Sequence, residues 1–385
     1  MTFFYKYDII DSYNNDMKIY IIGQKGIPAI SGGVENHVEN LATKLVKNGH
    51  DVFAYTRHNY SGKNSTEYQG VKLIPLPSLA TKNLDAISHT FLACLDFVFR
   101  RKADVVHFHS IGPASLIWII KLFKPKTKIV FTFHSQCYYN TKWGKLAKFY
   151  LMLGERIGCL LADKVIVVSK SLQRYVENKY KKQVEYIPNG VKIIEKKEIK
   201  EIKEKWSLEK DSYILSVSRI VKNKGLEYLV DAYQKIETEK KLVIVGDGDF
   251  LNKLKDLAKN NKNIIFTGSQ SGSVLSELFS NASLFVQASE AEGLSISLLE
   301  AMSAKLPLLV SNIDANKEVV KENALIFENK NVEDLKNKLK LFLEQRENLG
   351  IDKMTENNYN SLLAEYDWNK IVINIVNIYS CLTNK

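Results

Sequence analysis

Short runs of β-branched and aromatic residues alternate along the chain with longer segments in which apolar residues recur every three or four positions. This alternation predicts parallel β-strands connected by helices that cover both faces of a sheet. It extends over residues 18–187, is interrupted by a Lys- and Glu-rich segment at 191–210, and begins again at residue 213. We therefore expect an α/β protein with two doubly wound, Rossmann-like domains in series, facing each other across a cleft.

The spacing of the apolar residues predicts where the strands and helices lie. Strands are predicted at residues 18–24, 51–57, 71–75, 104–110, 128–134, 164–169, 184–187, 213–218, 242–245, 264–267, 284–288 and 307–311. Helices are predicted at residues 34–48, 84–100, 115–123, 142–161, 226–236, 250–259, 274–280, 297–304, 332–344 and 355–365. The segment 191–210 is expected to be a linker or an exposed helix.

These elements group into domains. We predict an N-terminal tail at 1–16, an N-terminal acceptor-side domain at 17–190 and a C-terminal donor-nucleotide-binding domain at 191–365. The last segment, 366–385, is expected to form a helix that packs back on the N-terminal domain.

Composition limits the class of protein and its location. The 385 residues are 45% hydrophobic and 25% charged, ordinary values for a globular protein. The four cysteines have no regular spacing, which is typical of a reduced compartment and favours no zinc site. No run approaches the roughly 20 apolar residues of a membrane span, and the N-terminus lacks the layout of a signal peptide. We expect a cytoplasmic protein.

The formal net charge of +11 is carried by one half of the chain. Residues 1–190 contain 26 Lys and Arg against 14 Asp and Glu, whereas the remainder is close to neutral. Nucleic acid and anionic membranes both attract such a surface, but the chain has no zinc finger, ribonucleoprotein motif or Arg-rich helix. We expect no nucleic acid partner. We expect peripheral binding at the anionic inner face of the plasma membrane, aided by Lys142, Lys145 and Lys148; a compositional lysine bias is the alternative.

Two glutamates eight residues apart, Glu292 and Glu300, flank the start of an apolar helix that follows a buried strand. Gly293 lets the backbone approach a ligand, and the start of the helix offers amide groups to a phosphate. The carboxylates suit the hydroxyl groups of a sugar, so the segment is suited to a sugar nucleotide. An arbitrary pair of glutamates at this spacing is far more often a solvated residue and a helix-opening residue.

Two cations follow the strand at 213–218, at what we expect to be its carboxyl end. Arg219 offers a two-pronged hydrogen-bond donor and Lys224 a mobile point charge, a combination suited to a diphosphate. Two solvated loop cations are an equally good interpretation of this segment alone. Asp247 and Asp249 lie in a turn after the next strand and, without further ligands, do not predict a metal site.

The first strand leads into a long Gly-containing loop rather than the tight turn of a dinucleotide site. Gly32 and Gly33 present backbone amides at the start of the following helix, suited to a phosphate; a flexible loop is the alternative. His134 ends a strand and is expected to face a ligand. For His107 and His109 a structural role is favoured.

Taken together, these motifs resemble glycosyltransferase family 4, the retaining nucleotide-sugar enzymes of the GT-B architecture. The resemblance runs from Met17 to the C-terminus. It rests on seven motifs in register: Gly-Gly-Val-Glu at 32–35, Phe-His-Ser at 133–135, Val-Val-Ser at 167–169, Ile-Pro-Asn-Gly-Val at 187–191, Ser-Arg-x4-Lys-Gly at 218–225, Gly-Asp-Gly at 246–248, and the two glutamates followed by Ala-Met and Pro307.

The resemblance implies roles for these residues. Arg219 and Lys224 would neutralise the donor diphosphate, Glu292 would accept hydrogen bonds from the transferred sugar, and Glu300 would accept them from the ribose. Backbone amides near Gly32, Gly33, Gly293, Leu294 and Ser295 would hold sugar and phosphate, and His134 would lie on the sugar and acceptor side. Glu292, His134, Arg219 and Lys224 form the predicted catalytic set. Members need no bound metal or cofactor, and same-face attack assisted by the leaving phosphate is the mechanism usually proposed.

The resemblance leaves other points open. The turn after Glu292 is Gly-Leu-Ser-Ile-Ser, where many members have Gly-Phe-Gly and then Pro, so Ser295 leaves the donor sugar undecided. We expect a hexosyltransferase that uses a nucleoside-diphosphate hexose or deoxyhexose and acts on a lipid-linked glycan of the capsule, O-antigen or exopolysaccharide type. A nucleotide-sugar epimerase and a noncatalytic sugar-nucleotide-binding protein are the alternatives.

Overall fold

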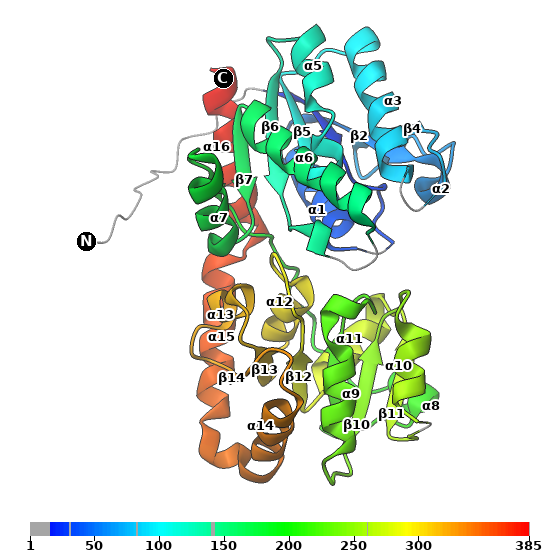
Figure 1. Cartoon of the computed structure of the whole chain (residues 1–385), viewed down its shortest axis with the longest axis vertical. Helices are drawn as coiled ribbons and strands as arrows, with labels where there is room; N and C mark the ends of the chain where they lie inside the picture. Colours follow the sequence, from blue (N-terminus) through cyan, green and yellow to red (C-terminus); the bar gives the residue numbers. More distant parts are fainter. Residues whose placement is uncertain (1–15, 31, 82–83, 140–142, 260, 385) are drawn as a thin grey trace, which may run out of the picture. The chain divides into compact units, whose positions relative to one another are not determined.

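The computed structural model describes residues 16–384 apart from 31, 82–83, 140–142 and 260 (Figure 1). Almost all of the predicted tail 1–16, and Lys142, lie outside the described residues. The strands are β1 Lys18–Ile22, β2 Asp51–Arg57, β3 Glu67–Tyr68, β4 Val71–Leu76, β5 Val105–His109, β6 Lys128–Phe133, β7 Lys164–Val167, β8 Glu185–Tyr186, β9 Tyr213–Val217, β10 Lys241–Val245, β11 Ile264–Gly268, β12 Leu284–Gln287, β13 Leu308–Ser311 and β14 Leu325–Phe327.

The helices connect these strands and follow them to the C-terminus. They are α1 Gly33–Lys47, α2 His58–Ser61, α3 Asp85–Arg100, α4 Ile111–Ala114, α5 Ile117–Phe123, α6 Lys145–Leu161, α7 Lys170–Tyr180, α8 Glu201–Trp206, α9 Leu226–Gln234, α10 Leu251–Leu257, α11 Gly272–Asn281, α12 Ile296–Ser303, α13 Asp314–Val320, α14 Val332–Gln345, α15 Ile351–Glu365 and α16 Trp368–Thr383, with short 3₁₀ turns at Cys137–Tyr139, Lys222–Lys224 and Arg346–Leu349. None of the helices within the described ranges is long and apolar enough to cross a membrane.

The strands form two sheets, and the predicted α/β fold is confirmed. The first has eight strands in the order β3-β4-β2-β1-β5-β6-β7-β8, with β3 antiparallel to β4. Strand β1 lies between β2 and β5, so the chain order reverses direction at β1. Residues 105–109 of β5 are all buried, as expected for a parallel strand covered on both faces.

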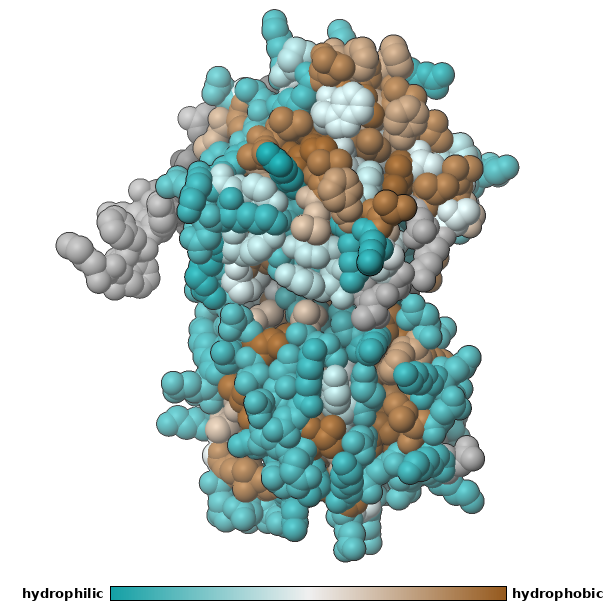
Figure 2. All heavy atoms as spheres, viewed as in Figure 1, coloured by the Kyte–Doolittle hydropathy of each residue, from teal (hydrophilic) through white to brown (hydrophobic). Residues whose placement is uncertain are grey.

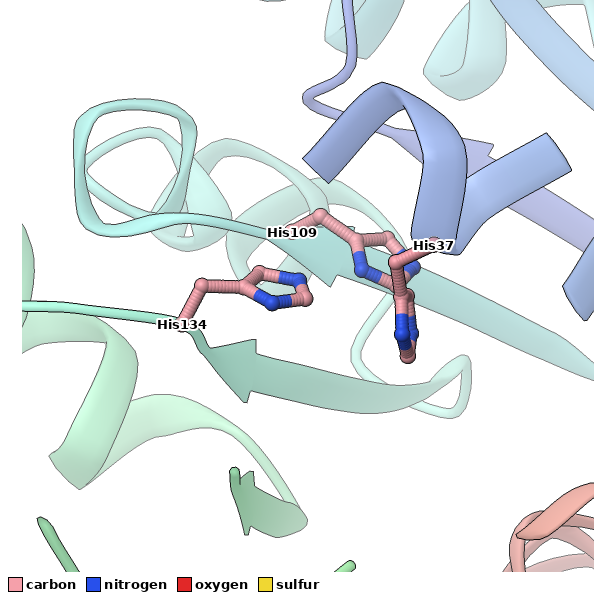
Figure 3. A group of neighbouring side chains, drawn as sticks. All are labelled: His37, His109 and His134. Carbon is pink, nitrogen blue, oxygen red and sulfur yellow. The ribbon is translucent and has the colours of Figure 1, made fainter. Parts of the chain in front are cut away.

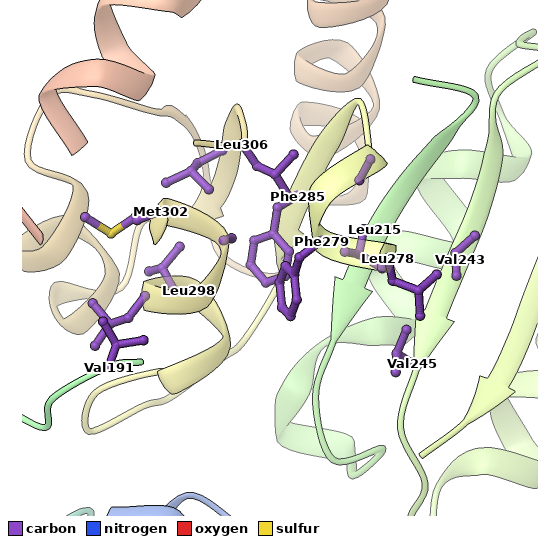
Figure 4. Close-up of a cluster of buried hydrophobic side chains, with 14 of the residues drawn as sticks. Val191, Leu215, Val243, Val245, Leu278, Phe279, Phe285, Leu298, Met302 and Leu306 are labelled. Atoms are coloured by element: carbon purple, nitrogen blue, oxygen red, sulfur yellow. The ribbon is translucent and has the colours of Figure 1, made fainter. Parts of the chain in front are cut away.

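The second sheet has six strands in the order β11-β10-β9-β12-β13-β14, and its pairs are parallel. Alternate residues of its central strands belong to two separate hydrophobic clusters. Tyr213 and Leu215 pack with α11 and α12, as Figure 4 shows for Leu215, whereas Ile214 packs with α9 and α14. Because neighbouring residues of a strand point to opposite faces, helices cover both faces of this sheet.

The strand order fixes where a ligand site can form in the second sheet. β9 is paired with β10 on one side and β12 on the other, so the chain order reverses at this strand. In doubly wound sheets, ligands bind beyond the carboxyl ends of the strands at such a point. The segments that follow β9 and β12 contain the predicted cations and the predicted glutamates.

Contacts divide the chain into two compact units. One comprises the described residues of Met1–Thr132, Gly154–Val165 and Val372–Lys385, and the other Phe133–Leu153 and Ile166–Ile371. Within the first unit, the Tyr379 hydroxyl of α16 lies 2.6 Å from His107 Nδ1 of β5. The boundaries at 190/191 and 365/366 remain predictions.

Several elements were not predicted. Helix α7 has only Leu172 and Val176 buried, too few apolar residues to show a period. Strand β14 has three residues, and α13 has seven. The segment at 191–210 contains the short helix α8, whose Ile202 is fully buried in a core cluster.

Candidate active site

The segment between β12 and α12 holds Glu292 through several donors. Glu292 Oε1 accepts hydrogen bonds from Ser289 Oγ at 2.7 Å and Gln287 Nε2 at 3.0 Å. Gln287 ends β12 and is buried, as is Ser289. The carboxylate is therefore fixed in position by side chains of its own strand–helix connection rather than free in solvent.

Lys224 supplies the third donor to the same oxygen. Its Nζ forms an ion pair with Glu292 Oε1, and the two side chains are only 19% and 11% exposed. Lys224 lies in the 3₁₀ turn between β9 and α9, so two neighbouring strands of the sheet deliver the two partners. Arg219, on the same connection, is exposed. The structure thus brings together the predicted lysine and the predicted sugar-binding glutamate.

Gly225 explains the path of the chain next to Lys224. Its φ is +63°, and a Cβ there would lie 2.1 Å from the Ala288 carbonyl oxygen. Only glycine combines this left-handed conformation with so close an approach of two backbone segments. The Lys-Gly pair of the sequence motif therefore packs the β9–α9 connection directly against the end of β12.

Glu290, two residues before Glu292, has different partners. Its Oε1 accepts a hydrogen bond from the Tyr228 hydroxyl at 2.8 Å, and its Oε2 lies 2.9 Å from Lys330 Nζ. These contacts hold Glu290 against α9 and the loop before α14. Glu292, not Glu290, is the partner of Lys224.

The start of α12 contains the remaining residues of this segment that were predicted to contact the nucleotide sugar. Ser295 is the N-cap, and its Oγ accepts from the Leu298 amide at 3.4 Å. The same hydroxyl donates to Gln287 Oε1 at 3.3 Å. Gly293 is buried and Leu294 half-buried, the latter packing against a core cluster. The start of the helix is therefore ordered around the Ser295 hydroxyl, which caps it.

Glu300 lies inside α12, half-buried. Burial raises the pKa of its carboxyl to about 7. In the described part of the chain, no cation pairs with it. It is a carboxyl that gains or loses its charge near neutral pH.

Gly32 and Gly33 begin α1, as predicted. Gly32 has φ +107°, and the space that its Cβ would take is filled by Glu35 Oε2 at 2.1 Å. Glu35 is buried, and its Oε1 accepts from the Lys25 amide at 3.3 Å. The anion that lies against Gly32 in this structure is thus the chain's own carboxylate.

The histidines separate into two kinds. His107 is buried in β5, with its ring nitrogens 2.6 Å from the Tyr379 hydroxyl and 2.7 Å from Thr132 Oγ1. Burial lowers its pKa to about 3, so it is neutral. This is the structural role favoured from the sequence.

His134 follows the last residue of β6, and β6 is paired with β5, which ends at His109. Figure 3 shows His37, from α1, beside them. All three are buried, and one ring nitrogen of each lies within 4.8 Å of the others. Among the described residues, these side chains have the spacing of a possible metal site, although the sequence predicted none. Imidazoles suit zinc or copper rather than the oxygen-preferring magnesium.

Sequence reasoning did not single out Gln287, Ser289 or His37. Gln287 and Ser289 lie where a buried strand ends in polar residues just before Glu292. Buried polar side chains at a strand end are a usable signal for a site. His37 lies on the apolar side of a helix, where a histidine alone is not diagnostic.

The two doubly wound sheets and the Lys224–Glu292 pair at the reversal of strand order agree with the class of nucleotide-sugar enzymes that the sequence motifs resemble. The family profile described as Glycosyltransferase Family 4 matches residues 31–194, and that described as Glycosyl transferases group 1 matches residues 198–361. The chain belongs to glycosyltransferase family 4 and has the GT-B fold; it is a glycosyltransferase that transfers a sugar from a nucleotide sugar.

Individual proteins agree with this assignment. Alpha-monoglucosyldiacylglycerol synthase of Streptococcus pneumoniae is 27% identical over 317 residues, which cover 76% of this chain and 70% of that protein. Sucrose-phosphate synthase of Thermosynechococcus elongatus superimposes with a TM-score of 0.79 at 20% identity, covering 94% and 98% of the two chains. The Anabaena protein Alr3699/HepE in complex with UDP-glucose has a TM-score of 0.77 at 16% identity, covering 95% and 100%. The likeness to the two solved structures concerns the fold alone.

Proposed function

We propose that the protein is a retaining hexosyltransferase that moves a hexose or deoxyhexose from a nucleoside-diphosphate donor to a lipid-linked glycan. The observation that carries the proposal is the Lys224–Glu292 ion pair at the reversal point of the second sheet. It places one cation and one carboxylate side by side in a largely desolvated position. A diphosphate and the hydroxyl groups of its attached sugar need that pair of charges.

Different side chains contact different parts of the nucleotide sugar. Lys224 and Arg219 neutralise the diphosphate, which gains negative charge as it leaves. Glu292 accepts hydrogen bonds from hydroxyl groups of the transferred sugar, and Glu300 accepts them from the ribose. The amides of Gly293, Leu294 and Ser295, with those of Gly32 and Gly33, hold sugar and phosphate. His134 contributes on the sugar and acceptor side.

The reaction exchanges one bond at the anomeric carbon for another. The bond from that carbon to the diphosphate oxygen breaks, and a bond to the acceptor oxygen forms on the same face of the sugar. The proton of the acceptor hydroxyl passes to the leaving diphosphate, so no protein base is needed. Lys224 and Arg219 stabilise the diphosphate through this step.

A lipid-linked acceptor is supported by charge and by one relative. The positive charge of residues 1–190 favours an anionic surface, and the Streptococcus relative is named as a synthase of a glucosylated diacylglycerol. We propose that the enzyme works in the cytoplasm, at the inner face of the plasma membrane.

Two rivals predict different behaviour. An epimerase would change the sugar without releasing a free nucleoside diphosphate, and would need acid and base groups at the sugar. A noncatalytic binder would lack a sugar-facing group, whereas Glu292 is present and held in position by three donors. Both alternatives would leave the donor phosphate bond intact.

The test combines binding with turnover. A thermal-shift panel of UDP-, GDP-, ADP- and dTDP-sugars identifies the donor, because a matched ligand stabilises the folded state by mass action. The stabilising donor is then incubated with enzyme, with and without membrane lipid extract. Release of nucleoside diphosphate with retention at the new linkage supports the proposal. Isomerised donor without diphosphate release supports the epimerase, and binding without any conversion supports the noncatalytic protein.

A further inference from the structure

Large hydrophobic side chains are exposed on α3, α5 and α6. Phe99 of α3 is 75% exposed, and Leu122 and Phe123 of α5 are 65% and 58% exposed. Figure 2 shows hydrophobic residues gathered over this part of the molecule. We call the following residues the apolar helix face: Phe91, Phe99, Trp118, Leu122, Phe123, Leu160 and Leu161. Single exposed hydrophobic residues are ordinary, but a contiguous group indicates a binding surface.

Two lysines join the three helices at this surface. Lys124, just after α5, donates to the carbonyl oxygen of Phe97 in α3 at 3.2 Å and to that of Arg101. Lys121 of α5 forms a 2.6 Å ion pair with Asp163, just after α6. The ends of α3, α5 and α6 are therefore held together, and their exposed side chains form one surface.

Helix α6 has the same character along its length. Leu146 is 87% exposed and Phe149 is 69% exposed, followed by Leu153 and Leu160. Steps of three, four and seven residues place these side chains along one side of the helix. Its opposite side contains the buried Leu151. The helix therefore presents apolar side chains outward as well as inward.

Charge around this surface selects its partner. Arg100, Lys102 and Lys126 are exposed at the ends of α3 and α5. Asp96 of α3 is engaged by Arg101 at 2.9 Å, and Glu155 of α6 is buried. In the described residues of α3, α5 and α6, no acidic side chain is exposed.

A second copy of the chain is a poor occupant, because a two-fold contact would place the same cations against each other. An anionic bilayer offers negative headgroups beside an apolar interior. Cations at the rim and aromatic residues such as Trp118 are typical of a surface that enters the headgroup region.

We propose that the apolar helix face inserts into the interfacial region of an anionic lipid bilayer. This goes beyond attraction by net charge, because charge alone holds a protein at the headgroups and is screened by salt. The inserted side chains add a contribution that salt does not weaken. The proposal concerns docking of the protein and is independent of which donor or acceptor it uses.

The test is cosedimentation of the full chain with vesicles of phosphatidylcholine and phosphatidylglycerol in equal parts, at low salt and at about 0.5 M salt. The patch variant carries Phe99→Ser, Leu122→Ser and Phe123→Ser. The matched control carries Leu257→Ser, Leu363→Ser and Ile373→Ser, which lie on α10, α15 and α16 and are 40%, 43% and 55% exposed. A rim variant carries Arg100→Glu, Lys102→Glu and Lys126→Glu.

We expect wild type and control to keep a salt-resistant bound fraction, and the patch variant to lose it with a fall in partitioning of on the order of 100-fold. The rim variant should bind less at low salt and yet keep its salt-resistant fraction. Complete release of wild type at high salt, or retention by the patch variant, would overturn the proposal. So would a wild-type dimer in solution that the patch variant converts to monomer. Circular dichroism and hydrolysis of donor without vesicles establish that each variant is folded, and they report separately on the proposed transferase.

Discussion

The two partners of the Lys224–Glu292 pair are unequally satisfied. Glu292 Oε1 accepts from Lys224, Ser289 and Gln287 together, whereas the Lys224 ammonium has Glu292 as its acidic partner. At an effective dielectric constant near 20, two such charges attract by about 4 kcal/mol before desolvation is subtracted. An arriving diphosphate can take over Lys224 while the other two donors still hold the carboxylate. The pair is therefore suited to exchange partners on donor binding.

This asymmetry predicts that substitutions of the two residues affect nucleotide binding differently. Lys224→Ala should weaken binding of both the free nucleoside diphosphate and the nucleotide sugar. Glu292→Ala should weaken only the nucleotide sugar, because it frees Lys224 for the diphosphate while removing a sugar contact. Both variants should lose 100-fold or more in kcat, about 3 kcal/mol of transition-state stabilisation. Calorimetric titration and steady-state kinetics measure these effects.

Thermal unfolding of the two variants without ligand provides the control, because both should have melting temperatures within a few degrees of wild type. Near wild-type turnover in either folded variant would refute the assigned roles. Equal loss of nucleoside diphosphate affinity in both would refute the exchange of partners.

Glu300 gives a second residue-scale prediction, on stability against pH. Its pKa is about 7 in the folded protein against an ordinary value of 4.5, so between these pH values the folded state binds more protons than the unfolded state. The contribution of the Glu300 carboxyl to folding stability is therefore fully present at low pH and is lost as the pH rises through 7. Glu300→Gln should therefore be close to wild type at pH 5 and more stable by on the order of 1–3 kcal/mol at pH 8. Urea unfolding at the two pH values measures the difference.

The Glu300 carboxyl should also make nucleotide binding depend on pH, with affinity rising over the range in which stability falls. If the ionised form receives the ribose hydroxyls, wild-type affinity for the nucleotide rises between pH 6 and pH 8, and the rise is absent in Glu300→Gln. A variant whose stability and affinity follow wild type at every pH would remove Glu300 from both roles.

At the scale of elements, two strand–helix connections build the proposed donor site. The β9–α9 turn and the β12–α12 turn come from adjacent strands, and Gly225 lets the first pack on the end of the second. The position of Lys224 therefore depends on backbone packing one residue away. A substitution at Gly225 acts on the site without touching a polar group.

Gly225→Ala should lower the free energy of unfolding by more than the cost of placing alanine at a positive φ. Gly350 is the matched control: it also has φ +63° and is also the N-cap of a helix, but an added Cβ there meets nothing within 4 Å. Gly350→Ala should cost about 1–2 kcal/mol from left-handed strain. Gly225→Ala should cost a further 1–3 kcal/mol from the clash with the Ala288 carbonyl, and should reduce nucleotide affinity. Equal unfolding free energies for the two variants would contradict this account.

The same elements show what the pattern of the sequence could predict. The β12–α12 segment is strongly patterned, and its strand, turn and helix were predicted to within a residue or two. The ion pair itself could not be predicted, because it joins residues 68 apart and depends on which strands are neighbours. Helix α7 was missed because its exposed face is almost entirely polar, and β14 because three residues carry no period.

At the scale of the whole molecule, the N-terminal and C-terminal halves of the sequence contain different kinds of functional surface. The positive charge and the apolar helix face lie in the N-terminal half, whereas the paired Lys224 and Glu292 lie in the nearly neutral C-terminal half. With the proposed site residues, the donor would meet individual, positioned charges rather than a broad positive field. The cation that neutralises its diphosphate has to be one of these side chains or a bound metal ion.

We expect that side chains, not a metal, do this, and that transfer survives removal of divalent cations. Glu292 is occupied by three donors, so it is a poor ligand for magnesium, while Lys224 and Arg219 follow the same strand. In the described part of the chain, the one group with metal-ligand spacing is His37, His109 and His134, whose nitrogens suit zinc or copper. Enzyme dialysed against EDTA should keep its kcat within about twofold, a change below 0.5 kcal/mol in the activation barrier. Activity lost to EDTA and restored by magnesium or manganese would show that the donor diphosphate needs a metal after all. A lower melting temperature in EDTA at unchanged kcat would instead assign a structural ion to the histidines.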